Sequence, residues 1–360
     1  MSNLKVTMIN SGYDGCCYPR LLLPCYHNGW WTDKPNQRED KINIENIRKQ
    51  LQASDVVVFH RAEEQQYHEL TKILKRDGKK IVMDNDDTFK LEDFHPLAQF
   101  TPDGKFQENL QKRQDNINEF IKLCDLVTAS TETLAEEYRE FNDNVIVLPN
   151  YIDPMEWETP LRNEGDKVRI GIVGSAAVEY DYLHIKGFIK ELSERNDVEI
   201  VLFGLGDLKH QKENPIVTKV FNDEYEFWNN INMTQFPWVK RYDYAETLNE
   251  AKLDIMLIPR RDNYFNRCKS NIKFLEASMC EIPVVAQSFE GGPYEELTPD
   301  IGFLIKDNKD WKPVVDKLIK DKELRRLVGK KAKEYTLNNY NIEDNAYKWA
   351  DAYSKLYEKN

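Results

Sequence analysis

The chain of 360 residues has no apolar run that approaches the roughly 18 residues needed for a membrane-spanning helix. Its first residues, MSNLKVTMINSGYDG, also lack the basic-then-apolar order of a secretory signal peptide, and they are typical of a first β-strand. These absences predict a cytoplasmic protein without a transmembrane segment. A peripheral position at a membrane stays open.

The sequence also has few of the residues that build metal or redox centres. Its six cysteines form no C-x-x-C pair and show no metal-ligand spacing with histidine, so we expect reduced thiols, mostly in the core. Cys16 and Cys17 follow a glycine turn, and a nucleophilic role there is the less favoured alternative. The net charge of −12 argues against a broad nucleic-acid-binding face but leaves room for a local basic cleft.

Two common catalytic fingerprints are missing. The segment GIVGS offers only Gly171 and Gly174, which is not the G-x-G-x-x-G spacing of a dinucleotide site. No G-x-S-x-G nucleophile elbow occurs either. An NAD-dependent dehydrogenase and a serine hydrolase of the α/β class are therefore poorly supported.

What the sequence does contain is a regular alternation of short β-branched runs with helical patterns. The predicted strands are Leu4–Asn10, Asp55–His60, Lys80–Asp84, Leu126–Ser130 and Val145–Leu148, and then 168–175, 198–204, 254–259, 282–286 and 302–305. Predicted helices between the first strands are Glu63–Lys75, Phe106–Leu123 and Thr133–Phe141. Such alternation is typical of parallel sheets covered by helices on both faces.

We therefore predict an α/β fold with two Rossmann-like domains that face a central cleft, where ligands of such sheets bind. The predicted boundaries are residues 1–153 for the first domain, 154–166 for a Pro- and charge-rich linker, 167–340 for the second domain and 341–360 for a final helix that packs back on the body. The aromatic stretch 205–237 receives no assignment.

The segment CKSNIKFLEASMCEIPVVA, residues 268–286, carries the clearest functional pattern. It predicts a helix that begins at Ser270 or Asn271 and is followed by a buried strand. Lysines are locally unfavourable at a helix N-terminus, but they suit it if a phosphate binds there. Lys273 lies in the first turns, and Glu276 follows one turn later, where it could accept hydrogen bonds from sugar hydroxyls. Two solvated surface lysines are the alternative.

This segment resembles the nucleotide-sugar signature of the retaining GT-B glycosyltransferases of glycosyltransferase family 4. The run VLPNYID (147–153) is similar to that family's segment between the two domains. So is the order of LDIMLIP, a polar loop, the Lys–Glu helix, PVVA and a glycine loop with Gly291 and Gly292. The resemblance is good over about residues 125–310 and weak in the N-terminal third.

The resemblance implies transfer from a nucleoside-diphosphate sugar with retention at the anomeric carbon, without a metal or any other cofactor. It assigns Glu276 to the donor ribose, and Lys273, Ser270 and Asn271 to the diphosphate. Lys186, followed by Gly187, matches the family's phosphate lysine. Lys186, Lys273 and Glu276 are thus the residues expected to carry the reaction.

Two departures from the family pattern alter the expected donor site. Cys268 stands where the family usually has a glutamate that contacts the donor sugar, and Ser175 stands where it has a phosphate-binding arginine. In the loop PRRDNYFNRCKS, Arg260, Arg261 or Asp262 could take over the sugar contact. Arg260, Arg261 or Arg241 could compensate for the missing phosphate-binding arginine.

Acceptor-side candidates come from strand ends in the first half. Gly12 lies in the glycine loop after the first strand, where backbone can approach a ligand closely, and Arg20 follows it. His60 and Arg61 end a buried strand, although His60 is slightly more typical of a satisfied core histidine. His95 is a further polar candidate, and more often such a residue is merely on the surface.

The segment MDNDDTF (83–89) has three interpretations. Asp84 and Asp86 could be metal ligands, as in the other large glycosyltransferase class. The segment could be a simple Asp/Asn-rich turn. Finally, Asp86 or Asp87 could bind acceptor hydroxyls at a strand end, which we prefer because the two-domain architecture argues against a catalytic metal.

The sequence thus predicts a glycosyltransferase. The alternatives are a nucleotide-sugar epimerase or hydrolase on the same fold, and a nucleotide-sugar-binding module without turnover. For the acceptor, we favour a glycan or glycolipid over a protein or nucleic acid. The sequence names neither base, sugar nor acceptor, and an oligomer stays open.

Overall fold

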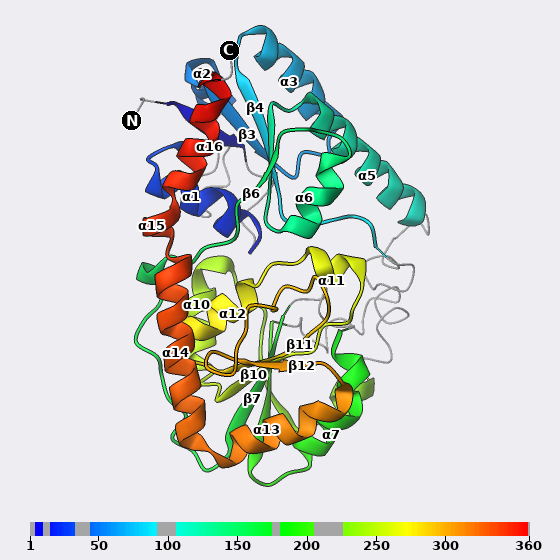
Figure 1. The fold of residues 1–360 in the computed structure, drawn as a ribbon, viewed down its shortest axis with the longest axis vertical. Helices are drawn as coiled ribbons and strands as arrows, with labels where there is room; N and C mark the ends of the chain where they lie inside the picture. Colours follow the sequence, from blue (N-terminus) through cyan, green and yellow to red (C-terminus); the bar gives the residue numbers. More distant parts are fainter. Residues whose placement is uncertain are drawn as a thin grey trace.

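A computed structural model describes residues 4–9, 15–32, 44–91, 106–174, 181–204 and 226–358. This part of the chain forms two six-stranded parallel sheets, each covered by helices, and the two halves are stacked along the long axis (Figure 1). The predicted α/β fold of two parallel-sheet domains is confirmed. We call the half with the first sheet the first domain and the other half the second domain.

The first sheet has the order β2-β1-β3-β4-β5-β6. Its strands are β1 (Val6–Ile9), β2 (Trp31–Thr32), β3 (Val56–His60), β4 (Lys80–Asn85), β5 (Leu126–Ala129) and β6 (Val145–Val147). The five strands predicted for this half are present, because each is a buried β-branched run. The short edge strand β2 was not predicted.

Helices and one π-helical turn surround this sheet. They are the π-helical turn η1 (Tyr18–Leu22), α1 (Leu23–His27), α2 (Ile44–Ala53), α3 (Gln65–Arg76), α5 (Phe106–Leu123) and α6 (Glu132–Arg139). The Thr131 hydroxyl caps α6 by accepting from the Leu134 N–H. The predicted helices at Glu63–Lys75, Phe106–Leu123 and Thr133–Phe141 correspond to α3, α5 and α6 within two residues at each end.

The second sheet has the order β12-β11-β10-β7-β8-β9. Its strands are β7 (Val168–Val173), β8 (Val198–Phe203), β9 (Met233–Phe236), β10 (Ile255–Ile258), β11 (Val284–Gln287) and β12 (Phe303–Ile305). Its helical segments are η2 (Pro154–Glu156), η4 (Asp181–Ile185), α7 (Lys186–Ser193), α10 (Arg241–Glu250), α11 (Tyr264–Cys268), α12 (Ile272–Met279), η5 (Asn308–Asp310), α13 (Trp311–Lys320) and α14 (Lys322–Tyr340).

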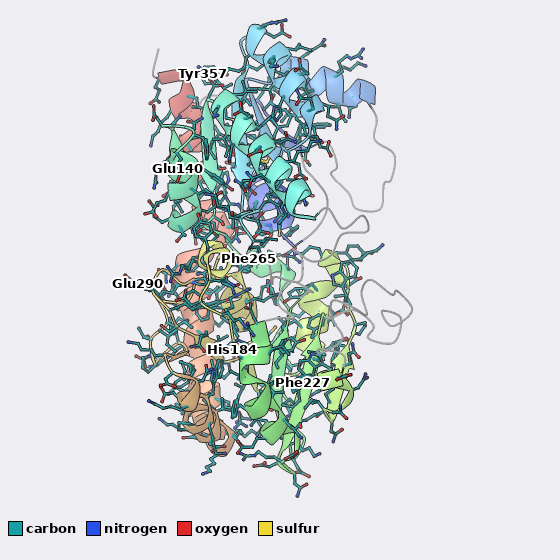
Figure 2. All side chains as sticks on the ribbon, turned by 90° about the vertical axis from the view of Figure 1, so that its right-hand side faces the viewer. Glu140, His184, Phe227, Phe265, Glu290 and Tyr357 are labelled. Carbon is teal, nitrogen blue, oxygen red and sulfur yellow. The ribbon has the colours of Figure 1, made fainter. Side chains whose placement is uncertain are left out.

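The C-terminal helices connect the two domains. After α14, the helices α15 (Ile342–Asn345) and α16 (Tyr347–Glu358) continue along the first domain (Figure 1). Tyr357, near the end of α16, lies at the far end of that domain (Figure 2). Trp349 and Tyr353 of α16 are buried in the core of the first sheet. The two segments that cross between the domains also pair, because the Ile342 N–H donates to the Ile152 carbonyl at 3.0 Å. The chain thus crosses between the domains twice, near Ile152 and near Ile342, and α16 anchors the C-terminus in the core of the first domain.

Candidate functional site

A cavity of about 550 Å³ lies between the domains, where the carboxyl ends of strands from both sheets meet. The second domain contributes residues after β7, β8 and β10 and the start of α12, and the first domain contributes residues after β4 and β6. We call it the interdomain cavity. Its lining residues are Gly15, Cys16, Asp86, Asn150, Val173, Gly174, Phe203, Gly204, Trp238, Val239, Arg241, Tyr244, Arg260, Lys269, Ser270, Ile272, Lys273 and Glu276.

Helix α12 sets the second-domain wall. Its buried side chains Phe274, Leu275 and Met279 fix it in the core, so its opposite side and its first turn face the cavity. Its N-cap, Asn271, makes no side-chain cap hydrogen bond, and the Asn271 amide donates instead to Glu296. The first turn therefore keeps the N–H groups and the positive end of the helix dipole turned toward the cavity.

Lys273 and Glu276 are bound to each other and to Tyr244 of α10. The Lys273 ammonium donates to Glu276 Oε2 at 3.0 Å and to the Tyr244 hydroxyl at 2.8 Å, and that hydroxyl donates to Glu276 Oε2 at 2.9 Å. Burial raises the pKa of Tyr244 well above its usual value, so the hydroxyl stays a donor. An ammonium has three N–H groups, so Lys273 retains one for a ligand, and Glu276 retains its second oxygen.

Two glycines form the floor of the cavity. A Cβ on Gly204, whose φ is +88°, would lie 2.8 Å from the Gly174 carbonyl oxygen, so only glycine fits there. Beside them, Phe203 stacks on Tyr244 with ring centroids 5.4 Å apart. Trp238 lines the cavity but is 62% exposed, which places a large aromatic ring at its rim.

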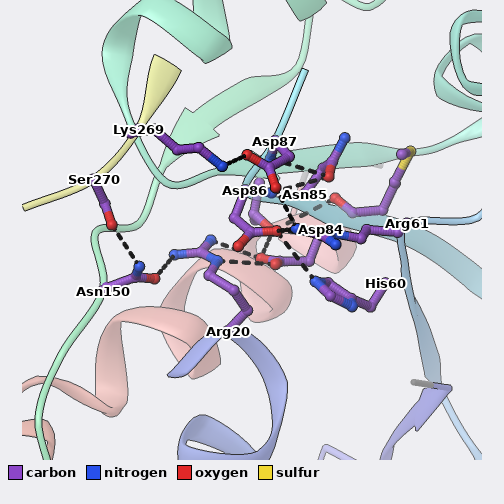
Figure 3. A network of polar contacts seen from close by, with 12 residues as sticks. Arg20, His60, Arg61, Asp84, Asn85, Asp86, Asp87, Asn150, Lys269 and Ser270 are labelled. Carbon is purple, nitrogen blue, oxygen red and sulfur yellow. Dashed lines mark hydrogen bonds and ion pairs between the residues drawn. The ribbon is translucent and has the colours of Figure 1, made fainter. Parts of the chain in front are cut away.

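The first-domain wall is a network of ion pairs after β4, shown in Figure 3. Arg61 donates to Asp86 at 3.0 Å and to Asp87 at 2.7 Å, and Lys269 reaches across from the second domain to Asp87. His60 Nε2 lies 3.5 Å from Asp86. Burial alone would raise the pKa of Asp86, but Arg61, His60 and Lys269 together hold it well below its usual value.

Beneath this wall, Arg20 is fully buried with Asp84. The guanidinium donates two hydrogen bonds to that carboxylate, at 3.0 and 2.7 Å, and a third to Asn150 at 3.2 Å. Asn150 in turn donates to the Ser270 hydroxyl at 2.8 Å, which ties the two domains together beside the cavity (Figure 3). Arg20 thus supports the site from behind.

The acidic segment at the end of β4 contains groups that could ligate a metal. Ligand atoms of Cys16, Asp86 and Asp87 lie within 4.8 Å of one another. Arg61 and Lys269 already bind the two carboxylates, and burial raises the pKa of the Cys16 thiol. Asp84, the other predicted ligand, is bound by Arg20. These residues therefore do not fit a divalent cation as they stand.

The predicted donor residues separate into two groups. Ser270, Lys273, Glu276 and Arg260 line the interdomain cavity, as does the candidate Arg241. Five others do not: Arg261 and Asp262 line a neighbouring cavity, and the Cys268 side chain is fully buried in the core of the first domain. Asn271 is bound to Glu296, and Lys186 is exposed at the start of α7. The roles predicted for Asn271 and Lys186 stay predictions.

The acceptor-side predictions also divide. Gly12, His95 and the departure at Ser175 lie outside the described residues. Arg20 and His60 are buried and do not line the cavity, and Arg61 and Asp87 lie directly behind Asp86 in the ion-pair network.

Sequence reasoning missed Tyr244 and Trp238. Neither stands in a recognisable motif, and both belong to the region after residue 205, where the strand β9 was not assigned. Lys269 was noted as one of the lysines at the helix start, but its partner Asp87 is 182 residues away. Only the fold brings these groups together.

Comparison with known proteins agrees with this geometry. Residues 185–351, which include α12, match the family described as glycosyl transferase-like. The structure is similar to sucrose-phosphate synthase from Thermosynechococcus elongatus, with a TM-score of 0.66 and 13% identity over 99% of this chain and 100% of that one. The chain has the GT-B fold that the two structures share.

Two further solved structures share this GT-B fold. HepE from Anabaena, in complex with UDP and glucose, has a TM-score of 0.65 and 14% identity over 98% of this chain and 99% of that one. TarM has a TM-score of 0.59 and 15% identity over 84% of this chain, which spans only 55% of TarM. No curated protein matches the sequence. Among the described residues, no helix is both long and apolar enough to cross a bilayer.

Proposed function

We propose that the protein transfers a sugar from a uridine diphosphate sugar to an acceptor hydroxyl, as a member of glycosyltransferase family 4. The observation that carries the proposal is the start of α12. It presents Ser270, Lys273 and Glu276 to a cavity between the domains, within the segment that matches the glycosyl transferase-like family. Uridine is proposed because HepE, which shares the fold, was solved with UDP.

The diphosphate would bind at the first turn of α12. Lys273 supplies its remaining N–H, and the Ser270 hydroxyl, which accepts from Asn150, can still donate its own proton. The N–H groups of the first helical turn add a fixed positive potential. Together these groups stabilise the negative charge that develops on the departing diphosphate, so the chain's own cations can neutralise this charge in place of a metal ion.

The ribose would bind to the second oxygen of Glu276. Lys273 and Tyr244 hold the other oxygen, so the carboxylate is fixed before the ligand arrives. A preorganised carboxylate loses little entropy on binding. The neighbouring Phe203 and Tyr244 rings and the two-glycine floor leave room for a flat ligand against the sheet edge.

The acceptor would approach from the first-domain wall. Asp86 lines the cavity there, and its low pKa keeps it ionised, so it can accept hydrogen bonds from acceptor hydroxyls but is a poor proton acceptor. Attack from the face of the leaving group, with retention, is proposed from the resemblance of the α12 segment to the retaining enzymes of family 4. A glycan or glycolipid, rich in hydroxyl groups, remains the favoured acceptor.

Calorimetric titration with UDP in the presence of EDTA tests the proposal. We expect saturable binding that weakens at least about tenfold in Lys273→Ala, because a charge-assisted hydrogen bond contributes about 1.5–3 kcal/mol. Lys331→Ala, which removes an exposed lysine paired with Asp300, is the matched control and should bind as the wild type does. Absence of UDP binding, or equal binding by Lys273→Ala, would refute the site.

Turnover is measured in the same buffer. We expect consumption of the sugar donor, with water or a glycan as acceptor, to persist in EDTA. Retention would be read from the anomeric proton coupling of the product. Complete loss of turnover in EDTA with recovery on Mn²⁺ would restore the interpretation of Asp84 and Asp86 as metal ligands.

A further inference from the structure

A second cavity, of about 490 Å³, lies at the same edge of the second sheet, beyond the ends of β10, β11 and β12. We call it the Lys306 cavity. Its lining residues are His184, Arg260, Arg261, Asp262, Gln287, Ser288, Phe289, Lys306 and Asn308. Arg260 lines both this cavity and the interdomain cavity, so a ligand in one can extend toward the other.

The Lys306 cavity has an excess of positive charge. Arg260, Arg261 and Lys306 line it, and Asp262 is the one carboxylate among the described lining residues. Asp262 is bound by a fourth cation, Arg267, at 2.7 and 3.0 Å. Behind the wall, the carboxylate of Asp181 lies 3.4 Å from Arg260, and it also accepts from the Arg261 backbone N–H.

Among the described residues that line the cavity, three cations thus stand against the one carboxylate of Asp262, and Asp181 and Glu290 act on Arg260 and Arg267 from outside the lining. His184 does not change this balance, because burial lowers its pKa and keeps it neutral at neutral pH. Gln287 is held in place by Trp311, whose indole N–H donates to it at 3.2 Å. The Lys306 side chain is exposed at the end of β12 and retains its ammonium for a ligand. A bound anion would restore the charge balance.

The donor sugar is the group best placed to supply this anion. The diphosphate proposed at α12 carries the sugar away from the nucleoside, and Arg260 marks the boundary between the two cavities. The described lining of the Lys306 cavity carries more cations than carboxylates, which suits a sugar with a carboxylate better than a neutral hexose.

We propose that the donor is a nucleoside diphosphate hexuronate, whose sugar carboxylate binds in the Lys306 cavity. This inference rests on the proposed function, since it needs the nucleotide in the interdomain cavity. It adds the class of sugar: a ring with a carboxylate, in place of a neutral hexose.

The test compares the affinities of UDP, UDP-glucose, UDP-glucuronate and UDP-galacturonate by calorimetry. We expect at least one hexuronate to bind about tenfold or more tightly than UDP-glucose, as one charge-assisted contact permits. In Lys306→Met this advantage should fall to less than about threefold, whereas the affinity for UDP itself should not change. Lys306 is exposed, so the substitution leaves the core intact.

Lys309→Met is the matched control. Lys309 lies three residues away, is paired with Asp307 at 2.9 Å and does not line the cavity. It should retain the full preference for the hexuronate, which separates a specific contact from general attraction to a basic surface.

Three results would overturn the inference. If UDP binds but both hexuronates bind no better than UDP-glucose, the sugar class is wrong while the proposed function stands. If the hexuronate advantage survives Lys306→Met, the carboxylate binds elsewhere. If UDP itself does not bind, the proposed function fails and this inference fails with it.

Discussion

The two walls of the interdomain cavity use charge in different ways. On the first-domain wall, Arg61 holds Asp86 and Asp87, and beneath this wall Arg20 and Asp84 are almost completely buried and bind each other with two hydrogen bonds. On the second-domain wall, Lys273 and Glu276 are also paired, but each keeps hydrogen-bonding capacity toward the cavity.

This difference separates structural charges from ligand-binding charges. A charge that is fully buried must be matched within the protein, because its desolvation is costly and no ligand can reach it. A charge at a cavity wall can be partly matched and still serve a ligand. We therefore expect the first-domain wall to fix the shape of the site and the second-domain wall to bind the proposed nucleotide.

The largest effect should come from breaking the buried pair. Arg20→Met leaves the Asp84 carboxylate buried without its partner, which should lower the free energy of unfolding by about 3–5 kcal/mol. Arg267→Met breaks the exposed pair with Asp262 and should cost less than about 1 kcal/mol. Urea denaturation measures both, and equal losses would mean that Arg20 has no special structural role.

Glu276→Ala should have a smaller effect, which concerns the affinity for UDP. Loss of the ribose contact should weaken UDP by about 1.5–3 kcal/mol. Pyrophosphate, which has no ribose, should bind this variant at least as well as the wild type, because Lys273 loses its neutralising partner. If calorimetry shows unchanged UDP affinity, Glu276 does not contact the nucleotide. A parallel loss for pyrophosphate would instead indicate a collapsed site.

The Tyr244→Phe variant isolates one hydroxyl group. It removes the bridge between Lys273 and Glu276 but keeps the stacking on Phe203, so the fold should be retained. We expect UDP affinity to fall by about 0.5–1.5 kcal/mol, because the carboxylate is less well fixed before binding. Melting temperatures serve as the control for folding. An affinity equal to that of the wild type would assign Tyr244 to packing alone.

The smallest effect concerns acid stability. The pKa of Asp86 is lower in the folded protein than in the unfolded chain, so the unfolded state binds more protons as the pH falls past its usual value of 3.8. The stabilisation by the Asp86 carboxylate is fully present at neutral pH. It is lost as the pH falls below 3.8 and then through the lower pKa of the folded state. Asp86→Asn should therefore show a shallower loss of stability on acidification between about pH 5 and 3. Parallel pH profiles would contradict the ion-pair network.

Burial decided which strands and helices could be predicted from the sequence. Strands such as β3 and β10 are runs of buried apolar residues, and their pattern alone predicted them. Strand β9, MTQF, is partly exposed and has no such pattern, and β2 has only two residues. The start of α12 was predicted because its polar residues stand next to a clear strand.

The partners of the polar residues could not be predicted. Arg20 was expected at the cleft, but Asp84 is 64 residues away, and only the packing of η1 against the first sheet buries the two together. Cys268 was expected near the sugar, but α11 turns it into the first domain, where the Thr131 hydroxyl binds its carbonyl at 3.0 Å. The sequence predicts which residues are polar at strand ends, and long-range contacts decide which of them face the ligand.

A crystal structure of the protein grown with UDP would test the central claim most directly. The account predicts the diphosphate at the first turn of α12, within hydrogen-bond distance of Lys273 and Ser270, with the ribose hydroxyls on Glu276. Nucleotide bound elsewhere, or against the first-domain wall at Arg61 and Asp86, would contradict it.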